Sequence, residues 1–356
     1  MNNHGANIYE LSKNLNVTKS QIKDFSSNVN PLGISKKALN NLKNNIDMIS
    51  MYPDPNYINL KKAISTYNNC SFDNIILGNG ATELISAFIK SFNFKNSALI
   101  YPCYSEYEKE LNKQNIHINK YILNENNDFE LDLNEFDNFI KSNNSDLVII
   151  CNPNNPTGSF LTDKDIEYLI KNNPNSLFMI DETYIEFSLK KTSGYLTDSY
   201  SNIFVIKGSS KFFSAPGIRL GYGIFSNKEG INKINKHIYP WNINIFAQLL
   251  GEIMFLDEEY IDSTKLYIQK EKDKLLKFLK SKKELKIYDS SSNFILIKIL
   301  KEDMNSSSLY NRLIKDYIAI RDCSSFEPLD NSYFRICVLD NDSNDLLITK
   351  LDNIFN

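Results

Sequence analysis

The chain contains very little arginine. Only 4 of its 40 basic residues are arginine, and the other 36 are lysine. A chain that uses lysine almost everywhere is expected to keep arginine where a planar, bidentate and permanently charged group is needed. We therefore treat the arginines as candidates for anion binding: Arg219, Arg312, Arg321 and Arg335.

Histidine, cysteine and long apolar runs are also scarce. Three histidines are too few for a histidine-rich metal site, and the five cysteines are widely spaced with no CxxC pair, which argues against a zinc ribbon or a disulfide framework. No apolar run approaches the roughly 18 residues of a membrane span. The N-terminus lacks the basic and apolar regions of a secretory signal. We therefore expect a cytoplasmic protein with reduced thiols and no membrane contact.

The charge balance is close to neutral. Forty basic residues face 43 acidic ones, giving a net charge of −3 and a pI near 5.8. Because the lysines are dispersed, this balance argues against a nucleic-acid partner. The 42% hydrophobic and 23% charged residues are typical of a globular protein with one large or two medium domains.

Six short apolar runs end in polar or glycine-rich turns, and helical periodicity separates them. Continuous apolar strands that alternate with helices indicate an α/β fold whose mostly parallel sheet is covered on both faces. Ligands of such sheets bind at the carboxyl ends of the strands. The runs span residues 74–80, 97–102, 146–158, 176–184, 203–211 and 220–225.

The C-terminal third has a different pattern. Residues 247–284 predict one or two long helices, and the strand-like runs KIYD, FILIKIL and YFRICVL follow, with a helix between them. This pattern indicates a smaller α+β domain. We predict an N-terminal segment over residues 1–40 that packs on this domain, a large domain over 41–250 and a small domain over 251–356.

Two strand ends carry reactive side chains. Lys211 of SSK follows one apolar run, with Arg219 eight residues later; a lysine in such an anion-binding pocket can lose its proton and form a Schiff base, although most lysines are surface residues. Asp181 of DETY ends another run. It is either a helix N-cap or a buried carboxylate that keeps a pyridinium nitrogen protonated.

Two further turns offer neutral contacts. In NPNNPTG (152–158), Asn155 between two prolines would present a fixed amide to a phenolate oxygen, and the alternative is simply a rigid turn. GNGAT (78–82) opens a helix directly after a strand. Backbone N–H groups at such a helix start bind phosphate.

These motifs occur in an order that resembles the fold-type I pyridoxal-phosphate enzymes of the class I/II aminotransferase family. The resemblance covers almost the whole chain. It implies a seven-stranded, mostly parallel sheet with a smaller α+β domain, pyridoxal 5′-phosphate as cofactor, and a homodimer with a shared active site.

The resemblance also implies roles for individual residues. Lys211 would carry the cofactor, Asp181 would pair with the ring nitrogen, and Tyr104 would stack on the ring. Asn155 and Tyr184 would bond the ring phenolate. The cofactor phosphate would be held by Gly80, Ala81, Thr82, Ser209, Ser210 and Arg219, together with Tyr52 of the partner subunit. Relatives usually have a phosphate-binding serine where this chain has Gly208.

Segments near both ends are similar to the threonine-phosphate decarboxylases of cobalamin biosynthesis. They are HGAN (4–7), DFSSNVNPLG (24–33), YPDPNY (52–57), YPWNIN (239–244) and AIRDC (319–323). The similarity implies decarboxylation of L-threonine O-3-phosphate to (R)-1-aminopropan-2-ol phosphate. His4, Asn30 and Arg321 would receive the substrate phosphate, and Arg335 would bind its carboxylate. Leu339 stands where these enzymes often have a basic residue.

Three alternatives stay open at this point. The same residues can run transamination if the Cα–H bond breaks instead of the bond to the carboxylate, as in histidinol-phosphate aminotransferases. Serine phosphate is a second candidate substrate for a decarboxylase. The fold could also serve a binding protein without catalysis.

Overall fold

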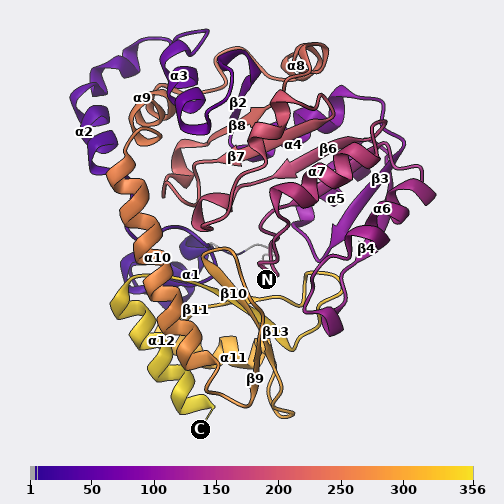
Figure 1. Ribbon diagram of the computed structural model, residues 1–356. Helices are drawn as coiled ribbons and strands as arrows, with labels where there is room; N and C mark the ends of the chain where they lie inside the picture. The colour runs from indigo at the N-terminus through magenta and orange to yellow at the C-terminus, as the bar shows by residue number, and fades with distance from the viewer. Residues whose placement is uncertain (1–4, 6, 356) are drawn as a thin grey trace.

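A seven-stranded sheet forms the centre of the protein in the computed structural model, which describes residue 5 and residues 7–355 (Figure 1). The strand order is β2-β8-β7-β6-β5-β3-β4, and only β8 runs antiparallel to its neighbours. The mostly parallel sheet predicted from the sequence is confirmed. Its strands are β2 (Ile75–Asn79), β3 (Asn96–Tyr101), β4 (His117–Ile122), β5 (Leu147–Cys151), β6 (Leu177–Asp181), β7 (Ile203–Gly208) and β8 (Leu220–Ile224).

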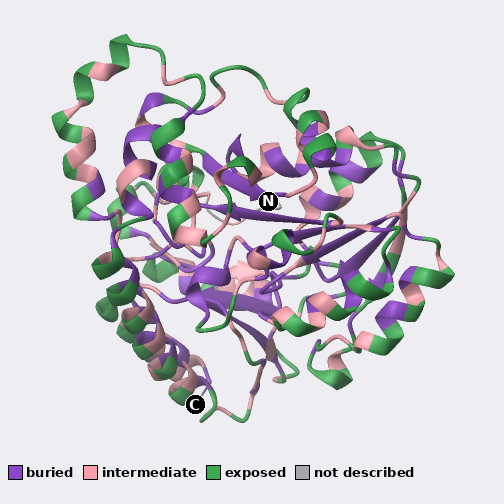
Figure 2. Cartoon of the chain, turned by 45° about the horizontal axis from the view of Figure 1, so that its top comes forward, coloured by how far each residue is buried: buried purple, intermediate pink, exposed green. Residues whose placement is uncertain are grey.

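The central strands read as continuous apolar runs because both of their faces are buried. In β5, Leu147 and Ile149 pack in one apolar cluster with residues of α4 and α5, whereas Val148 and Ile150 pack in another with α6 and α7. Figure 2 shows these strands buried between helices whose outer faces are exposed. Side chains that alternate along a strand must therefore be apolar on both sides.

Helices cover the sheet, and further helices and strands together build the lower part of the molecule in Figure 1. The stretch 247–284 forms two helices, α9 and α10, as one of the two expected arrangements. The helices are α1 (Ile8–Leu15), α2 (Lys36–Asn44), α3 (Ile58–Asn68), α4 (Ala81–Ser91), α5 (Ser105–Lys113), α6 (Leu133–Ser142), α7 (Asp163–Asn172), α8 (Lys228–Asn235), α9 (Ile245–Met254), α10 (Glu258–Leu279), α11 (Ser306–Leu313) and α12 (Asn341–Ile354).

A second, four-stranded antiparallel sheet lies in the C-terminal part, with the order β12-β13-β10-β9. Its strands are β9 (Leu285–Ile287), β10 (Phe294–Ile299), β12 (Arg321–Asp322) and β13 (Tyr333–Cys337). β1 (Lys23–Asp24) pairs in parallel with β11 (Ile318–Ala319), so the N-terminal segment joins the C-terminal part. The domain boundaries near residues 40 and 250 stay predictions.

Strand β4 is absent from the sequence prediction. It lies at the edge of the large sheet, where it pairs only with β3, and five of its six residues are exposed or half-buried. An edge strand needs no apolar run, because one side of it borders water.

The described part of the chain contains neither a candidate membrane span nor a candidate metal site. Within residues 5 and 7–355, no helix combines the length and apolar character that a membrane crossing requires. The same residues contain no group of three or more His, Cys, Asp or Glu side chains that could hold a metal ion.

Candidate active site

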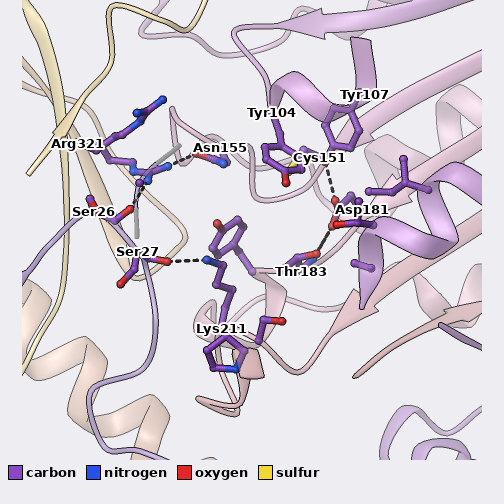
Figure 3. A pocket seen from close by; sticks show the side chains of 18 of the residues that line it. Ser26, Ser27, Tyr104, Tyr107, Cys151, Asn155, Asp181, Thr183, Lys211 and Arg321 are labelled. Carbon is purple, nitrogen blue, oxygen red and sulfur yellow. Dashed lines mark hydrogen bonds between the residues drawn. The ribbon is translucent and has the colours of Figure 1, made fainter. Parts of the chain in front are cut away.

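A cavity of about 300 Å³ collects most of the side chains singled out from the sequence. It lies where the carboxyl ends of β5 and β6 and the loop after β7 meet the short strands β12 and β13 (Figure 3). The predicted residues that line it are Ala81, Thr82, Tyr104, Asn155, Asp181, Tyr184, Ser210, Lys211, Arg219, Arg321 and Arg335.

Lys211 enters the cavity from the loop that follows β7. Its Nζ donates a hydrogen bond to the carbonyl oxygen of Ser27 at 2.6 Å. Burial of the amino group lowers the pKa of Lys211 to about 8, and the positive charge of Arg335 acts in the same direction. A lysine with this pKa is partly neutral at physiological pH, which is the form that attacks a carbonyl carbon.

Asp181 ends β6 and is buried. One carboxylate oxygen accepts a hydrogen bond from the Tyr107 hydroxyl at 2.6 Å, and the other accepts the backbone N–H and the hydroxyl of Thr183. No lysine or arginine among the described residues forms an ion pair with Asp181. A buried carboxylate without a cationic partner favours a cationic donor from a ligand.

Tyr184 and Asn155 also line the cavity. The Tyr184 hydroxyl accepts a hydrogen bond from the Asn28 side chain at 3.4 Å. Burial raises the pKa of Tyr184 to about 12, so the phenol is neutral and can donate its proton to a ligand oxygen. The Asn155 side-chain oxygen accepts a hydrogen bond from Arg335.

The start of α4 forms one end of the cavity together with Arg219. Gly80 caps this helix with a φ of +79°, and a Cβ at Gly80 would lie 2.2 Å from the Nη2 atom of Arg219. Only glycine permits both this backbone conformation and this close approach. Free N–H groups of the helix start, the guanidinium and the nearby Ser210 form an environment suited to a phosphate.

The structure places two residues near this end differently from the sequence interpretation. Ser209 does not line the cavity: it is fully buried, and its hydroxyl donates to the carbonyl oxygen of Leu220 at 2.9 Å. At Gly208, an added Cβ would lie 3.8 Å from carbon atoms of Ala81 and Thr183, which is ordinary contact. The position therefore has room for a small side chain.

Arg335 is a buried cation that has no acidic partner within the described chain. Its guanidinium donates to Asn155 and, at 2.9 Å, to the carbonyl oxygen of Ser26, while its Nε–H has no partner. The guanidinium lies 5.1 Å from the ring centre of Phe294. Since a buried charge is costly without an opposite charge, Arg335 is suited to bind an anion.

Arg321 lies directly across the sheet from Arg335, because β12 and β13 pair these two residues. Its guanidinium donates to the Ser325 hydroxyl at 2.8 Å and lies 5.1 Å from the ring centre of Phe326. Like charges at directly opposite positions destabilise a strand pair. Two such arginines on one cavity therefore favour a ligand with two anionic groups.

Asn30 does not line the cavity. It is buried, and its side-chain amide donates to the carbonyl oxygen of Phe212 and to the Tyr260 hydroxyl, both at 2.9 Å. Its side-chain oxygen accepts the N–H of Leu32. These bonds fix the loop, and the predicted contact of Asn30 with a substrate phosphate stays a prediction.

Two other positions named from the sequence, Tyr52 and Leu339, lie apart from the cavity. Tyr52 is 80% exposed and packs against Trp241 at a ring-centre distance of 5.0 Å. Leu339 packs against the large apolar core. His4 lies outside the described residues.

Sequence reasoning assigned no role to several residues that line the cavity, and four of these make hydrogen bonds to the predicted residues. Ser26 and Ser27 contribute carbonyl oxygens, and Tyr107 and Thr183 contribute hydroxyls to Asp181. The hydroxyl contacts were detectable in principle, because Tyr107 follows Tyr104 by three residues on one helical face and Thr183 lies within DETY. The carbonyl contacts carry no side-chain signal.

Comparison with known proteins identifies the family. The model of aminotransferase class I and II matches residues 20–351. The chain belongs to this family. Membership in this family indicates that the chain is an enzyme and that its cofactor is pyridoxal 5′-phosphate.

Three similar proteins carry three different names. The chain is 36% identical over 355 residues to the "Adenosylcobalamin biosynthesis bifunctional protein CobDQ" of Leptospira interrogans, covering 99% of this chain but only 41% of that protein. It is 29% identical to the threonine-phosphate decarboxylase of Salmonella typhimurium, over 99% of this chain and 96% of the relative. The histidinol-phosphate aminotransferase structure from Clostridium acetobutylicum has 35% identity and a TM-score of 0.88, covering 94% of this chain and 99% of that one.

The cavity residues fit pyridoxal 5′-phosphate. The buried Asp181 carboxylate without a cation suits the ring nitrogen, and the neutral Tyr184 phenol suits the ring oxygen. Lys211, with its lowered pKa, suits the aldehyde carbon. The α4 helix start with Arg219 suits the phosphate.

Proposed function

We propose that this aminotransferase-family protein catalyses the decarboxylation of L-threonine O-3-phosphate to (R)-1-aminopropan-2-ol phosphate, in the biosynthesis of cobalamin. One observation carries the proposal: the cross-strand pair of Arg321 and Arg335 borders the same cavity as Lys211. A small amino acid with a carboxylate at one end and a phosphate at the other matches two neighbouring cations. The relatives from Leptospira and Salmonella support this assignment by their names.

Each cavity residue has a proposed role toward cofactor or substrate. When bound, pyridoxal 5′-phosphate supplies a conjugated ring that accepts the electrons of a bond breaking at the substrate Cα. Asp181 would pair with the ring nitrogen, and Tyr184 and Asn155 would hold the ring oxygen. Tyr104 would pack against the ring, and Ala81, Thr82, Ser210 and Arg219 would bind the phosphate.

The two arginines would decide which substrate bond breaks. A Cα bond is cleaved when it lies perpendicular to the ring plane, because its electrons can then enter the conjugated system. Arg335 would bind the substrate carboxylate by a two-pronged contact, and Arg321 would bind the substrate phosphate. Anchoring both ends of a short molecule fixes its rotation about Cα. Lys211, which is partly protonated near pH 8, would then donate the proton that replaces the carboxylate.

An assay without a keto acid tests the proposal. The purified enzyme with pyridoxal 5′-phosphate is incubated with threonine phosphate or serine phosphate, and carbon dioxide and the phosphorylated amine are measured. Release of both products from threonine phosphate supports the decarboxylase. Release from serine phosphate alone assigns the other substrate, and the absence of carbon dioxide from both contradicts the proposal.

Transamination of histidinol phosphate is the second candidate. The similarity to the Clostridium acetobutylicum aminotransferase structure, at 35% identity, favours it. It would use the same Lys211 as a base at the Cα–H bond. Product that forms from histidinol phosphate only when 2-oxoglutarate is present would support this alternative over the first.

We further propose a cytoplasmic homodimer in which Tyr52 reaches the cofactor phosphate of the partner subunit. Support comes from its exposure: Tyr52 lies outside its own cavity and is 80% exposed. Tyr239 and Trp241 are also strongly exposed, at 82% and 48%. Exposed aromatic side chains that cluster in this way are typical of protein interfaces.

A further inference from the structure

We infer that Tyr107 is a positioning residue that fixes the Asp181 carboxylate in the cavity, and so holds its negative charge beside the ring nitrogen of the cofactor. The inference rests on the proposed role of Asp181 toward that nitrogen. It does not depend on which substrate or reaction is correct.

The contact is short and buried, with the Cys151 thiol beside it. The Tyr107 hydroxyl donates to an Asp181 oxygen at 2.6 Å (Figure 3), and Tyr107 is 1% exposed. The tyrosine is fixed from the other side by Tyr104, whose ring lies edge-on at 5.7 Å. Burial holds the pKa of Tyr107 well above its usual range, so the phenol remains a proton donor and does not become an anion.

Among the described residues, the hydrogen-bond donors to the Asp181 carboxylate are neutral. Its other oxygen accepts the N–H of Thr183 at 2.9 Å and the Thr183 hydroxyl. The described residues place no lysine or arginine within ion-pair distance of this carboxylate. Tyr107 and Thr183 therefore each fix one carboxylate oxygen and leave the charge of Asp181 to pair with a cationic group of a ligand.

The consequence concerns the proton on the ring nitrogen. A carboxylate that Tyr107 holds in place keeps its negative charge beside that nitrogen and favours the proton there. Without the phenol the carboxylate is held less firmly, its contact with the ring nitrogen weakens, and the ring loses positive charge. A less cationic ring withdraws fewer electrons, both from a breaking substrate bond and from the Lys211 nitrogen joined to it.

The test compares two tyrosine variants in the absence of substrate. Tyr107→Phe removes only the hydroxyl, and Tyr222→Phe is the matched control, since Tyr222 is equally buried but bonds the Asn68 side chain outside the cavity. Each protein is loaded with pyridoxal 5′-phosphate, and its visible absorbance is titrated with pH. Thermal unfolding of both variants reports the cost of a lost buried hydroxyl.

Tyr107→Phe should move the absorbance midpoint upward by about 1 pH unit, because a hydrogen bond to a charged group has about that effect. Tyr222→Phe should leave the midpoint unchanged. With substrate, Tyr107→Phe should lower kcat more than it changes KM. An unmoved midpoint in folded Tyr107→Phe, or the same movement in the Tyr222→Phe control, overturns the inference.

Thr183→Val provides an independent variant. It removes the hydroxyl donor to the other Asp181 oxygen and keeps the side-chain shape. If Tyr107→Phe does not fold, an upward movement in Thr183→Val supports the role of neutral donors, and an unmoved midpoint overturns it. A wild-type protein that binds no pyridoxal 5′-phosphate contradicts the cofactor assignment itself, whereas failed decarboxylation with a normal titration contradicts only the proposed reaction.

Discussion

Lys211 should lose its proton far more readily than an ordinary lysine. The ordinary lysine pKa is 10.5, and burial together with the charge of Arg335 lowers the pKa of Lys211 to about 8. At pH 7 about one Lys211 amine in ten is then neutral, compared with about one in three thousand for an unperturbed lysine. The structure thus predicts a roughly 300-fold larger neutral fraction at the cavity.

Competitive labelling measures this difference without cofactor or substrate. Cofactor-free protein reacts with a trace of acetic anhydride at a series of pH values, and the labelled peptides are quantified by mass spectrometry. The reactivity of Lys211 should rise with pH to a midpoint near 8. Limited access to the cavity lowers the maximum rate but leaves the midpoint in place, and exposed lysines of the same digest provide the reference.

Arg335→Gln tests the electrostatic part of the argument. Removing the positive charge should move the Lys211 midpoint upward, because Arg335 lowers this pKa. Arg312→Gln is the matched control, since Arg312 is an exposed arginine outside the cavity. A Lys211 midpoint above about 10 in the wild type would refute the predicted desolvation of the amine. A Lys211 midpoint that is the same in Arg335→Gln as in the wild type would refute the charge effect.

Three further outcomes are expected. Arg335→Lys keeps the charge but loses the planar pair of donors, so kcat/KM should fall about 10- to 100-fold; an unchanged value in steady-state kinetics would remove Arg335 from substrate binding. Gly208→Ser has room for its side chain and should tighten pyridoxal 5′-phosphate binding about 2- to 10-fold in equilibrium dialysis, whereas weaker binding would show that the hydroxyl cannot reach the phosphate. Mixing Lys211→Ala chains with Tyr52→Ala chains should restore about a quarter of the activity if each site is shared across a dimer, and no recovery in mixed dimers would contradict sharing.

The fold was largely readable from the sequence because parallel strands buried on both faces need continuous apolar runs. The runs at 203–211 and 220–225 became β7 and β8. The edge strand β4 was not readable, since an exposed edge places no such demand on its side chains. The antiparallel direction of β8 was also not predictable, because its residue composition does not differ in kind from that of the parallel strands.

The candidate site divides in a similar way. Asp181, Tyr184 and Lys211 were identified because each belongs to a short motif at a strand end, where the chemistry depends on residue type. The loop contacts of Asn30 were not predictable, since the sequence does not distinguish an asparagine that holds a loop from one that binds a ligand.

The sequence by itself determined the family motifs, the central strands and the scarcity of arginine, because these depend on local composition and order. Only the tertiary structure decided that Arg321 and Arg335 are cross-strand neighbours and that Tyr107 bonds Asp181 from a helix 74 residues away. Such contacts arise when distant segments pack into one cavity, and their energy depends on distance, burial and direction, which no single segment contains.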